Sequence, residues 1–354
     1  MGSKPAASND WSSLDHHMIQ DDVSWLQSVL ISSEVAHDWQ GVLGLGLAPH
    51  SARIVHESLQ LLRRKNKVGV KQVELEYPRE VAAARHAIKL LDDTAKSYED
   101  VLSDFEQMDT DTGGSPIDPR AFAIATRDHR IYSTTRVAAF YGISTAGTRP
   151  RGENSREYKV AFDMGRAASR VLRAFNMKLP DATAIPMNGT APTAQGRNRV
   201  DYLNGRFEPN FPTPLKDLLT VVESSVNVAN DLLEPCTEAF TSSLFRIRMV
   251  VVTHAINTLR EVIRRHEDIT THPPVSAIAS IVNSEDAARI GELRALRNRC
   301  MHYGIPGNLN GLSTKLPVYG LVEATSPGTS FDEVDAALRR LLTRISDGMR
   351  DWSA

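Results

Sequence analysis

Apolar residues recur at helical spacing over most of residues 213–354, apart from a loop at 305–330 that could hold one short strand, and this pattern constrains the fold more than any other feature of the chain. It predicts four helices, over residues 215–235, 238–267, 284–303 and 331–352. The second has a clear apolar stripe, formed by Leu244, Ile247, Val251, Ala255 and Leu259. Ser330 and Glu333 have the spacing of a capping box at the start of the last helix. A unit of this length can bury a core of its own.

A segment rich in proline and glycine, residues 179–212, separates this helical unit from the rest of the chain. Before it, helical spacing extends over residues 21–43, 80–108 and 153–177. Residues 68–77 alternate between apolar and polar and fit either a strand or an extended connector. We therefore expect a mainly α protein. A largely helical N-terminal region, residues 1–178, precedes a linker at 179–212 and a C-terminal bundle of four to five helices at 213–354.

The formal net charge of −2 does not mark the whole chain as a polyanion-binding protein, so any basic surface must be local. Acidic residues dominate 92–111 and basic residues dominate 120–173, either as solvated faces or as surfaces that mimic and attract a polyanion. The sequence lacks an apolar run of membrane-spanning length and an apolar signal core at the N-terminus. We expect a cytoplasmic protein with no membrane partner.

The sequence also argues against several kinds of chemistry. Cys236 and Cys300 are too few for a disulfide framework or a cysteine zinc site, and their apolar context is typical of buried hydrophobic residues. Histidines and acids are scattered, without a known metal-binding spacing, and no glycine-rich segment ends as a phosphate-binding loop does. We expect neither a metal nor another cofactor.

One short stretch, residues 292–307, combines unusual polar residues at a helix end. Arg297, Asn298 and His302 lie within two turns of Gly304, a common residue just after a helix. Cations at a helix C-terminus are also ordinary, so a solvated helix end is one interpretation. A site that binds and cleaves a phosphodiester is the other.

Helical geometry gives these residues an expected arrangement. Leu293, Leu296 and Cys300 fall on one face and should point into the core, whereas Asn298 and His302 are one turn apart on another. Arg297 and His302 would lie about 140° apart around a continuous helix. One helix cannot easily direct both at the same atom. A second copy of the helix, in a homodimer or a related second domain, would complete such a cleft.

The motif Arg297-Asn298-x-x-x-His302, late on the penultimate long helix of a C-terminal helical unit, resembles the R-x4-6-H motif of the HEPN superfamily. A polar residue directly after the arginine belongs to that pattern. The resemblance covers residues 213–354 and implies a metal-independent endoribonuclease. Its products would be a 2′,3′-cyclic phosphate and a 5′-hydroxyl. His302 would act as general base or acid, Arg297 would bind the scissile phosphate, and Asn298 would hold the histidine or a phosphate oxygen.

RNA is the partner that this resemblance implies, in single-stranded regions of tRNA or mRNA. Arg294, Arg299 and Tyr303 are further candidates for RNA contacts. A solvated Arg299 and a core position for Tyr303 are the alternatives, and the core position is preferred. In bacteria, such proteins commonly serve as toxins or anti-phage defence effectors, which adds an inhibitor or trigger protein as a partner. The N-terminal region would then select the target, sense the trigger or restrain the nuclease.

Two other interpretations belong to different classes of protein. The C-terminal unit could be a non-catalytic HEPN-like module that binds RNA or a nucleotide, or a helical scaffold in which the same helix forms a dimer interface. Residues 126–136 also gather several arginines beside Tyr132 and could form an RNA-contacting patch.

Overall fold

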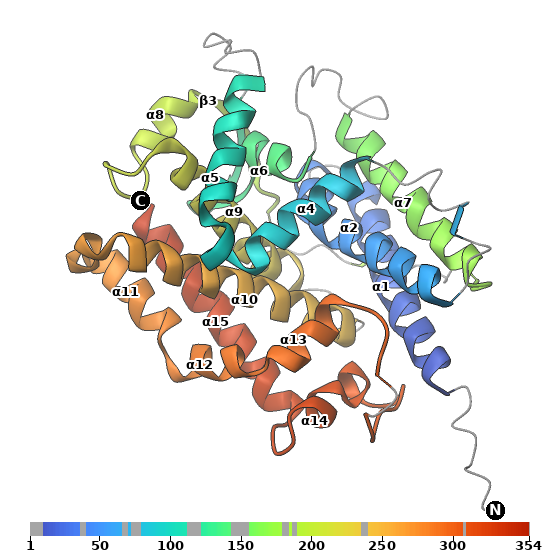
Figure 1. Cartoon of the computed structure of the whole chain (residues 1–354). Helices are drawn as coiled ribbons and strands as arrows, with labels where there is room; N and C mark the ends of the chain where they lie inside the picture. Colours follow the sequence, from blue (N-terminus) through green and yellow to red (C-terminus); the bar gives the residue numbers. More distant parts are fainter. Residues whose placement is uncertain are drawn as a thin grey trace, which may run out of the picture.

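The structure is a computed structural model of the chain, and it describes residues 10–35, 40–65, 70–71, 79–111, 122–142, 156–178, 184–185, 190–234, 240–306 and 309–353. Over these residues the protein is mainly helical, as predicted, with one small sheet (Figure 1). No described helix combines the length and the apolar character needed to cross a membrane. The expected strand or connector at 68–77 falls largely outside the described residues.

The helices of the first half are α1 (Asp10–Val35), α2 (Gln40–Lys65), α4 (Arg79–Asp92), α5 (Thr94–Asp111), α6 (Thr135–Phe140) and α7 (Arg156–Ala174). Two single helices that we predicted are each divided in the structure. The range 21–43 contains the end of α1 and the start of α2, which packs against α1. The range 80–108 is divided at Asp93. There the Thr94 hydroxyl donates to the Leu91 carbonyl at 3.1 Å, which satisfies a carbonyl group at the end of α4.

The second half contributes α8 (Arg199–Asn204), α9 (Thr213–Asn227), α10 (Thr241–Arg265), α11 (Pro273–Val282), α12 (Glu285–Glu292), α13 (Arg294–Met301), α14 (Leu321–Thr325) and α15 (Phe331–Trp352). A π-helical turn, Val228–Leu232, extends α9, and 3₁₀ turns occupy Glu267–Thr271 and Pro317–Gly320. The capping box of Ser330 and Glu333 is confirmed.

The prediction of one continuous helix over 284–303 is also wrong, because the structure divides this range into α12 and α13. It breaks at Leu293, whose ψ of 36° leaves the helical range, and α13 starts in a new direction. Gly291, a weak helix former, lies two residues before this break.

Helix α10 forms the centre of the molecule. Nearly every side chain along it from Ser243 to Val262 is buried, because helices of both halves pack around it. Figure 1 shows α1, α2 and α7 on one side of α10, and α11, α12 and α15 toward the other. The buried side chains of α10 include polar and charged ones, among them Arg246, His254 and Glu261. Most buried apolar residues form one continuous core from Leu14 to Trp352, and Ile124 and Ile131 of the sheet form a small separate cluster. The two halves therefore share a core across the expected linker.

The small sheet contains β1 (Phe122–Arg127), β2 (Arg130–Thr134) and β3 (Thr193–Arg197), in the order β2-β1-β3 with antiparallel pairs. The residues joining β1 and β2, Asp128 and His129, both have positive φ, as the tight turn of a hairpin requires. Strand β3 and helix α8 lie within the segment expected as a linker.

The hairpin changes the interpretation of residues 126–136. Strand β2 packs against α9, where the Glu223 carboxylate accepts from the Ile131 amide at 3.0 Å. Tyr132 is fully buried, and Arg130 donates to Asp347 at 2.6 Å. These side chains dock the sheet on the helices and do not form an open RNA-contacting patch.

Candidate active site at the end of α13

The end of α13 places the motif residues, and its inner face follows the prediction. Leu293, Leu296 and Cys300 are buried, and Cys300 is the small core residue that its context indicated. Burial raises the pKa of the Cys300 thiol to about 12, so it stays protonated and is a poor nucleophile. Cys236 lies outside the described residues.

His302 lies outside the helix, contrary to our expectation. Helix α13 ends at Met301, and His302 has extended backbone angles, φ −119° and ψ 146°. Its amide donates to the Asn298 carbonyl at 3.1 Å, so the helix finishes at this residue. Asn298 and His302 therefore do not stack as neighbours on one helical stripe. The 140° separation calculated for a continuous helix does not apply.

The His302 imidazole is held by the N-terminal half of the chain. Its Nδ1 lies 2.8 Å from Glu57 Oε2 on α2, and the second oxygen of Glu57 accepts from Arg85 Nε on α4 at 3.3 Å. Burial alone would raise the pKa of Glu57. The hydrogen bond and charge of His302, with the charge of Arg85, outweigh it and lower that pKa below its ordinary value. An ionised carboxylate can only accept, so Nδ1 carries the proton.

This pairing leaves the other ring nitrogen of His302 available. The His302 side chain is 44% exposed, whereas that of Glu57 is 5% exposed. Among the described residues, none forms a hydrogen bond with Nε2 of His302. His56 lies close enough to interact electrostatically with both groups, and burial lowers the pKa of its imidazole. A half-exposed histidine oriented by a buried carboxylate can exchange a proton with a bound molecule.

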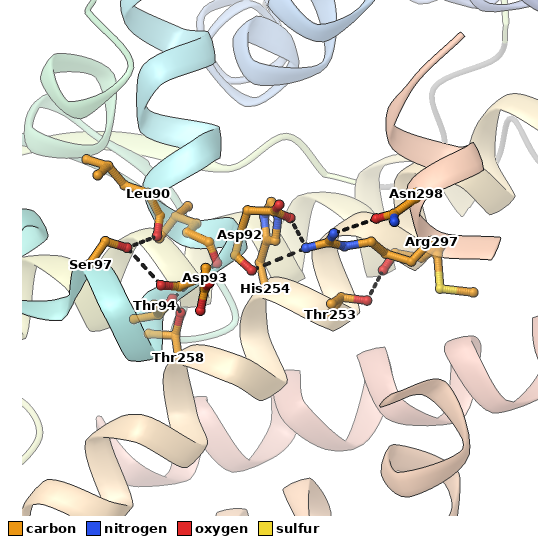
Figure 2. A network of polar contacts seen from close by, with 12 residues as sticks. Leu90, Asp92, Asp93, Thr94, Ser97, Thr253, His254, Thr258, Arg297 and Asn298 are labelled. Carbon is orange, nitrogen blue, oxygen red and sulfur yellow. Dashed lines mark hydrogen bonds and ion pairs between the residues drawn. The ribbon is translucent and has the colours of Figure 1, made fainter. Parts of the chain in front are cut away.

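Arg297 points elsewhere, into a second polar cluster (Figure 2). Its Nη2 donates to both the carboxylate and the backbone carbonyl of Asp92, the last residue of α4, the carbonyl at 3.2 Å. Its Nη1 donates to Asn298 Oδ1 at 2.8 Å, so the Asn298 side chain orients Arg297. The Arg297 side chain is only 15% exposed.

His254, on α10, completes this cluster. Its Nε2 lies 3.2 Å from Asp92 Oδ1, and Figure 2 shows Asp92 between His254 and Arg297. Burial lowers the pKa of His254, and the nearby charges of Arg297 and Arg85 add to this effect. Burial would raise the pKa of Asp92, but the hydrogen bond from His254 and the charge of Arg297 lower it overall. The carboxylate is therefore ionised near neutral pH, and both His254 and Arg297 stabilise its charge.

The three residues expected to contact RNA have different positions. Arg294 is exposed, and Arg299 Nη1 donates to the Gly304 carbonyl at 3.1 Å. Tyr303 lies in the core, the preferred alternative, and its hydroxyl donates to Asp22 Oδ2 at 2.5 Å. Burial raises the pKa of Tyr303 well above its usual range. In this conformation the Tyr303 ring cannot stack on a base.

The backbone after His302 is fixed by the N-terminal helices. Asp15 Oδ1 on α1 accepts from the amides of Gly304 and Ile305, at 2.9 and 3.2 Å. Arg64 on α2 donates to the Tyr303 carbonyl at 2.9 Å. Gly304 has a φ of +99°, and an added Cβ would lie 2.8 Å from Arg64 Nη2. The positive φ favours the glycine predicted to follow the helix, and a larger residue would also have to shift the Arg64 guanidinium.

Sequence reasoning missed the partners of the motif: Glu57, Arg85, Asp92 and His254. All four come from helices outside the motif, and three of them precede the expected linker. One signal was present, since His254 interrupts an apolar run of α10. Nothing local marks Glu57 or Asp92, because each is one acid among many.

Among the described residues, no group of three or more His, Cys, Asp or Glu side chains is arranged to hold a metal ion. No protein-family model, curated protein or solved structure matches the chain. The function must therefore be argued from the site itself.

Proposed function

We propose that the protein is a metal-independent endoribonuclease in which His302 transfers the proton during cleavage of an RNA phosphodiester. The observation that carries this proposal is the pair formed by His302 and Glu57. A buried carboxylate fixes Nδ1, and the imidazole itself is half-exposed. This is the arrangement in which an imidazole is an effective general base, since the carboxylate stabilises the imidazolium that forms.

The reaction uses groups that RNA itself provides. Nε2 of His302 takes the proton of a 2′-hydroxyl, and the 2′-oxygen attacks the adjacent phosphorus. The bond from phosphorus to the 5′-oxygen breaks, and the imidazolium returns the proton to that oxygen. The products are a 2′,3′-cyclic phosphate and a 5′-hydroxyl, and no external nucleophile or oxidant is consumed.

Positive charge around His302 supports a phosphate-containing substrate. Arg85 shares Glu57 with the histidine, while Arg64 and Arg299 bind the carbonyl groups of the two residues after it. Guanidinium groups suit phosphate oxygens because they combine a permanent charge with several N–H donors. A flexible single strand, in tRNA or mRNA, can adopt the in-line geometry that such cleavage needs.

The remaining proposals concern the setting of this activity. The resemblance to the HEPN superfamily favours a toxin or anti-phage defence effector in the cytoplasm, controlled by an inhibitor or trigger protein. A homodimer also stays a prediction. In the structure, the neighbours of the motif are α2, α4 and α10 of the same chain.

The test is cleavage of total RNA by the purified protein in EDTA, compared with His302→Ala. His86→Ala is the matched control, because His86 is an exposed histidine on α4. We expect cleavage by the wild type and the control, loss in His302→Ala, and 5′-hydroxyl product ends. Equal cleavage by His302→Ala would refute the assignment. RNA binding without cleavage, under all conditions, would support the non-catalytic module.

A further inference from the structure

The junction of α4 and α5 forms an elbow, residues 90–97, that reaches the candidate site. Helix α4 ends at Asp92, Asp93 forms a turn, and Ser97 has non-helical angles of φ −103° and ψ 15°. The Ser97 hydroxyl donates back to the Leu90 carbonyl at 2.6 Å (Figure 2). The elbow therefore has two points at which the helical hydrogen-bond pattern is interrupted.

Few polar contacts fasten this elbow to the body of the protein. The hydroxyl groups of Thr94 and Thr258, on α10, lie 2.9 Å apart. Within the described ranges, the other polar contacts between the elbow and the body are those of Asp92 with His254 and Arg297. Leu91 and Thr94 are buried and hold the elbow on the core, and Asp92 adds a charged point of attachment at Arg297.

Arg297 is bound as it would be by a substrate anion. Carboxylate and phosphate oxygens accept from a guanidinium in similar geometry. Asp92 offers Arg297 a carboxylate oxygen and a carbonyl oxygen together. With Asp92 in place the Arg297 side chain is 15% exposed, so a phosphate cannot reach it without displacing the carboxylate.

The cluster also contains donors that Asp92 leaves unsatisfied. Within the described part of the chain, Arg297 Nε and Arg85 Nη1 are buried and lack a hydrogen-bond partner. Both arginines lie close enough to His254 to lower its pKa, a shift whose main cause is burial. A buried N–H without an acceptor is unfavourable, and a phosphate offers more acceptor oxygens than a carboxylate does.

We propose that Asp92 occupies the position of a substrate phosphate on Arg297, so that the elbow holds the nuclease in a latent state. This inference rests on the proposed RNA-cleaving function. Activation requires the elbow to move so that Asp92 leaves Arg297. The guanidinium groups of Arg297 and Arg85 can then bind the phosphates of an RNA strand. A partner that pulls on α4 or α5 would activate the enzyme, and one that packs the elbow down would inhibit it.

The experiment compares the wild type with Asp92→Asn, which removes the charge and keeps the size of the side chain. The matched control is Asp93→Asn, because Asp93 is the neighbouring, half-exposed acid and forms an ion pair with Lys96, three residues along the chain. Thr94→Val is a second test that loosens the elbow and leaves every charge in place. Unfolding curves show whether each variant is folded.

Two quantities are measured for each variant with one single-stranded sequence. The first is the affinity for its 2′-O-methyl form, which cannot be cleaved, and the second is the cleavage rate of the unmodified RNA. We expect Asp92→Asn to raise the affinity by about 5-fold to 100-fold, the usual range of coupling between sites. Thr94→Val should raise the affinity by a smaller factor, and Asp93→Asn should leave the affinity unchanged. Adding Arg297→Ala to Asp92→Asn should abolish the gain.

The outcomes separate the two proposals. If the affinity of folded Asp92→Asn is unchanged while Arg297→Ala alone weakens the wild type, phosphate already reaches Arg297 and latency is refuted. If Asp92→Asn binds more tightly and no variant cleaves, latency stands and the ribonuclease proposal fails. If no folded variant binds or cleaves RNA, both proposals fail.

Discussion

Replacing Glu57 by glutamine tests the central contact of the site without any assumption about the substrate. The substitution keeps the shape of the side chain and removes the charge that His302 Nδ1 and Arg85 Nε share. Breaking a fully buried ion pair costs about 3–5 kcal/mol, whereas exposed pairs contribute about 0–1 kcal/mol. Glu57 is 5% exposed and His302 is 44% exposed, so this pair lies between these limits. We expect Glu57→Gln to lower the free energy of unfolding by about 2 kcal/mol near neutral pH.

The pH dependence of this loss follows from the lowered pKa of Glu57. A carboxyl whose folded-state pKa lies below its ordinary value of 4.5 stabilises the protein above that pH. The contribution is lost as the pH falls through the lower, folded-state pKa. The difference between wild type and Glu57→Gln should therefore be full near neutral pH and become smaller below about pH 4.5.

Urea denaturation at several pH values measures this difference. Glu99→Gln is the matched control, because Glu99 is 74% exposed and also pairs with an arginine. Glu99→Gln should lower the free energy of unfolding much less than Glu57→Gln does. A double-mutant cycle with His302→Ala should show coupling of about 1 kcal/mol between Glu57 and His302. Equal stability of Glu57→Gln and wild type near neutral pH, or a loss that does not diminish in acid, would refute the described pair.

Two further predictions concern buried groups. Tyr303→Phe removes the hydroxyl that donates to Asp22 and should destabilise the protein by about 1–3 kcal/mol, with RNA affinity unchanged. Reduced affinity at unchanged stability would instead assign the hydroxyl to an RNA contact. The pKa of His50 is lowered to about 3, chiefly by burial and then by the charge of Arg53. In the unfolded chain His50 binds a proton below about pH 6.5, so wild-type stability should fall with acid by about 1.4 kcal/mol per pH unit from this group. His50→Leu should remove that slope between about pH 6 and 4.5, and the exposed His86→Leu should not; identical slopes would contradict it.

The helical content of the protein follows from the spacing of its apolar residues, but the interruptions of its helices do not. Residues 80–108 and 284–303 each fit one continuous helix by periodicity, and each is broken in the structure. A break costs little locally, so packing against α10 decides where it falls. The break between α4 and α5 places Asp92 at the site. His302 follows the end of α13 and has an extended backbone conformation.

The candidate site shows the same limit at the level of side chains. The inward positions of Leu293, Leu296 and Cys300 depend only on position within the helix, and the prediction was correct. The partners of Arg297 and His302 depend on contacts between residues more than 200 positions apart, at Asp92 and Glu57. The residues around each position do not indicate such distant contacts. The angular positions of residues around a single helix could not predict them either.

The observed packing also restricts how a homodimer could form this site. A cleft built from two copies of α13 requires the second copy to approach Arg297, where Asp92 already lies. His302 is more exposed, but its Nδ1 is committed to Glu57 of the same chain. A two-fold cleft in which Arg297 binds a phosphate would therefore require Asp92 to leave the guanidinium. If dimerisation activates the protein, it must do so by displacing the elbow. In that case Asp92→Asn should increase both RNA affinity and the tendency to form dimers.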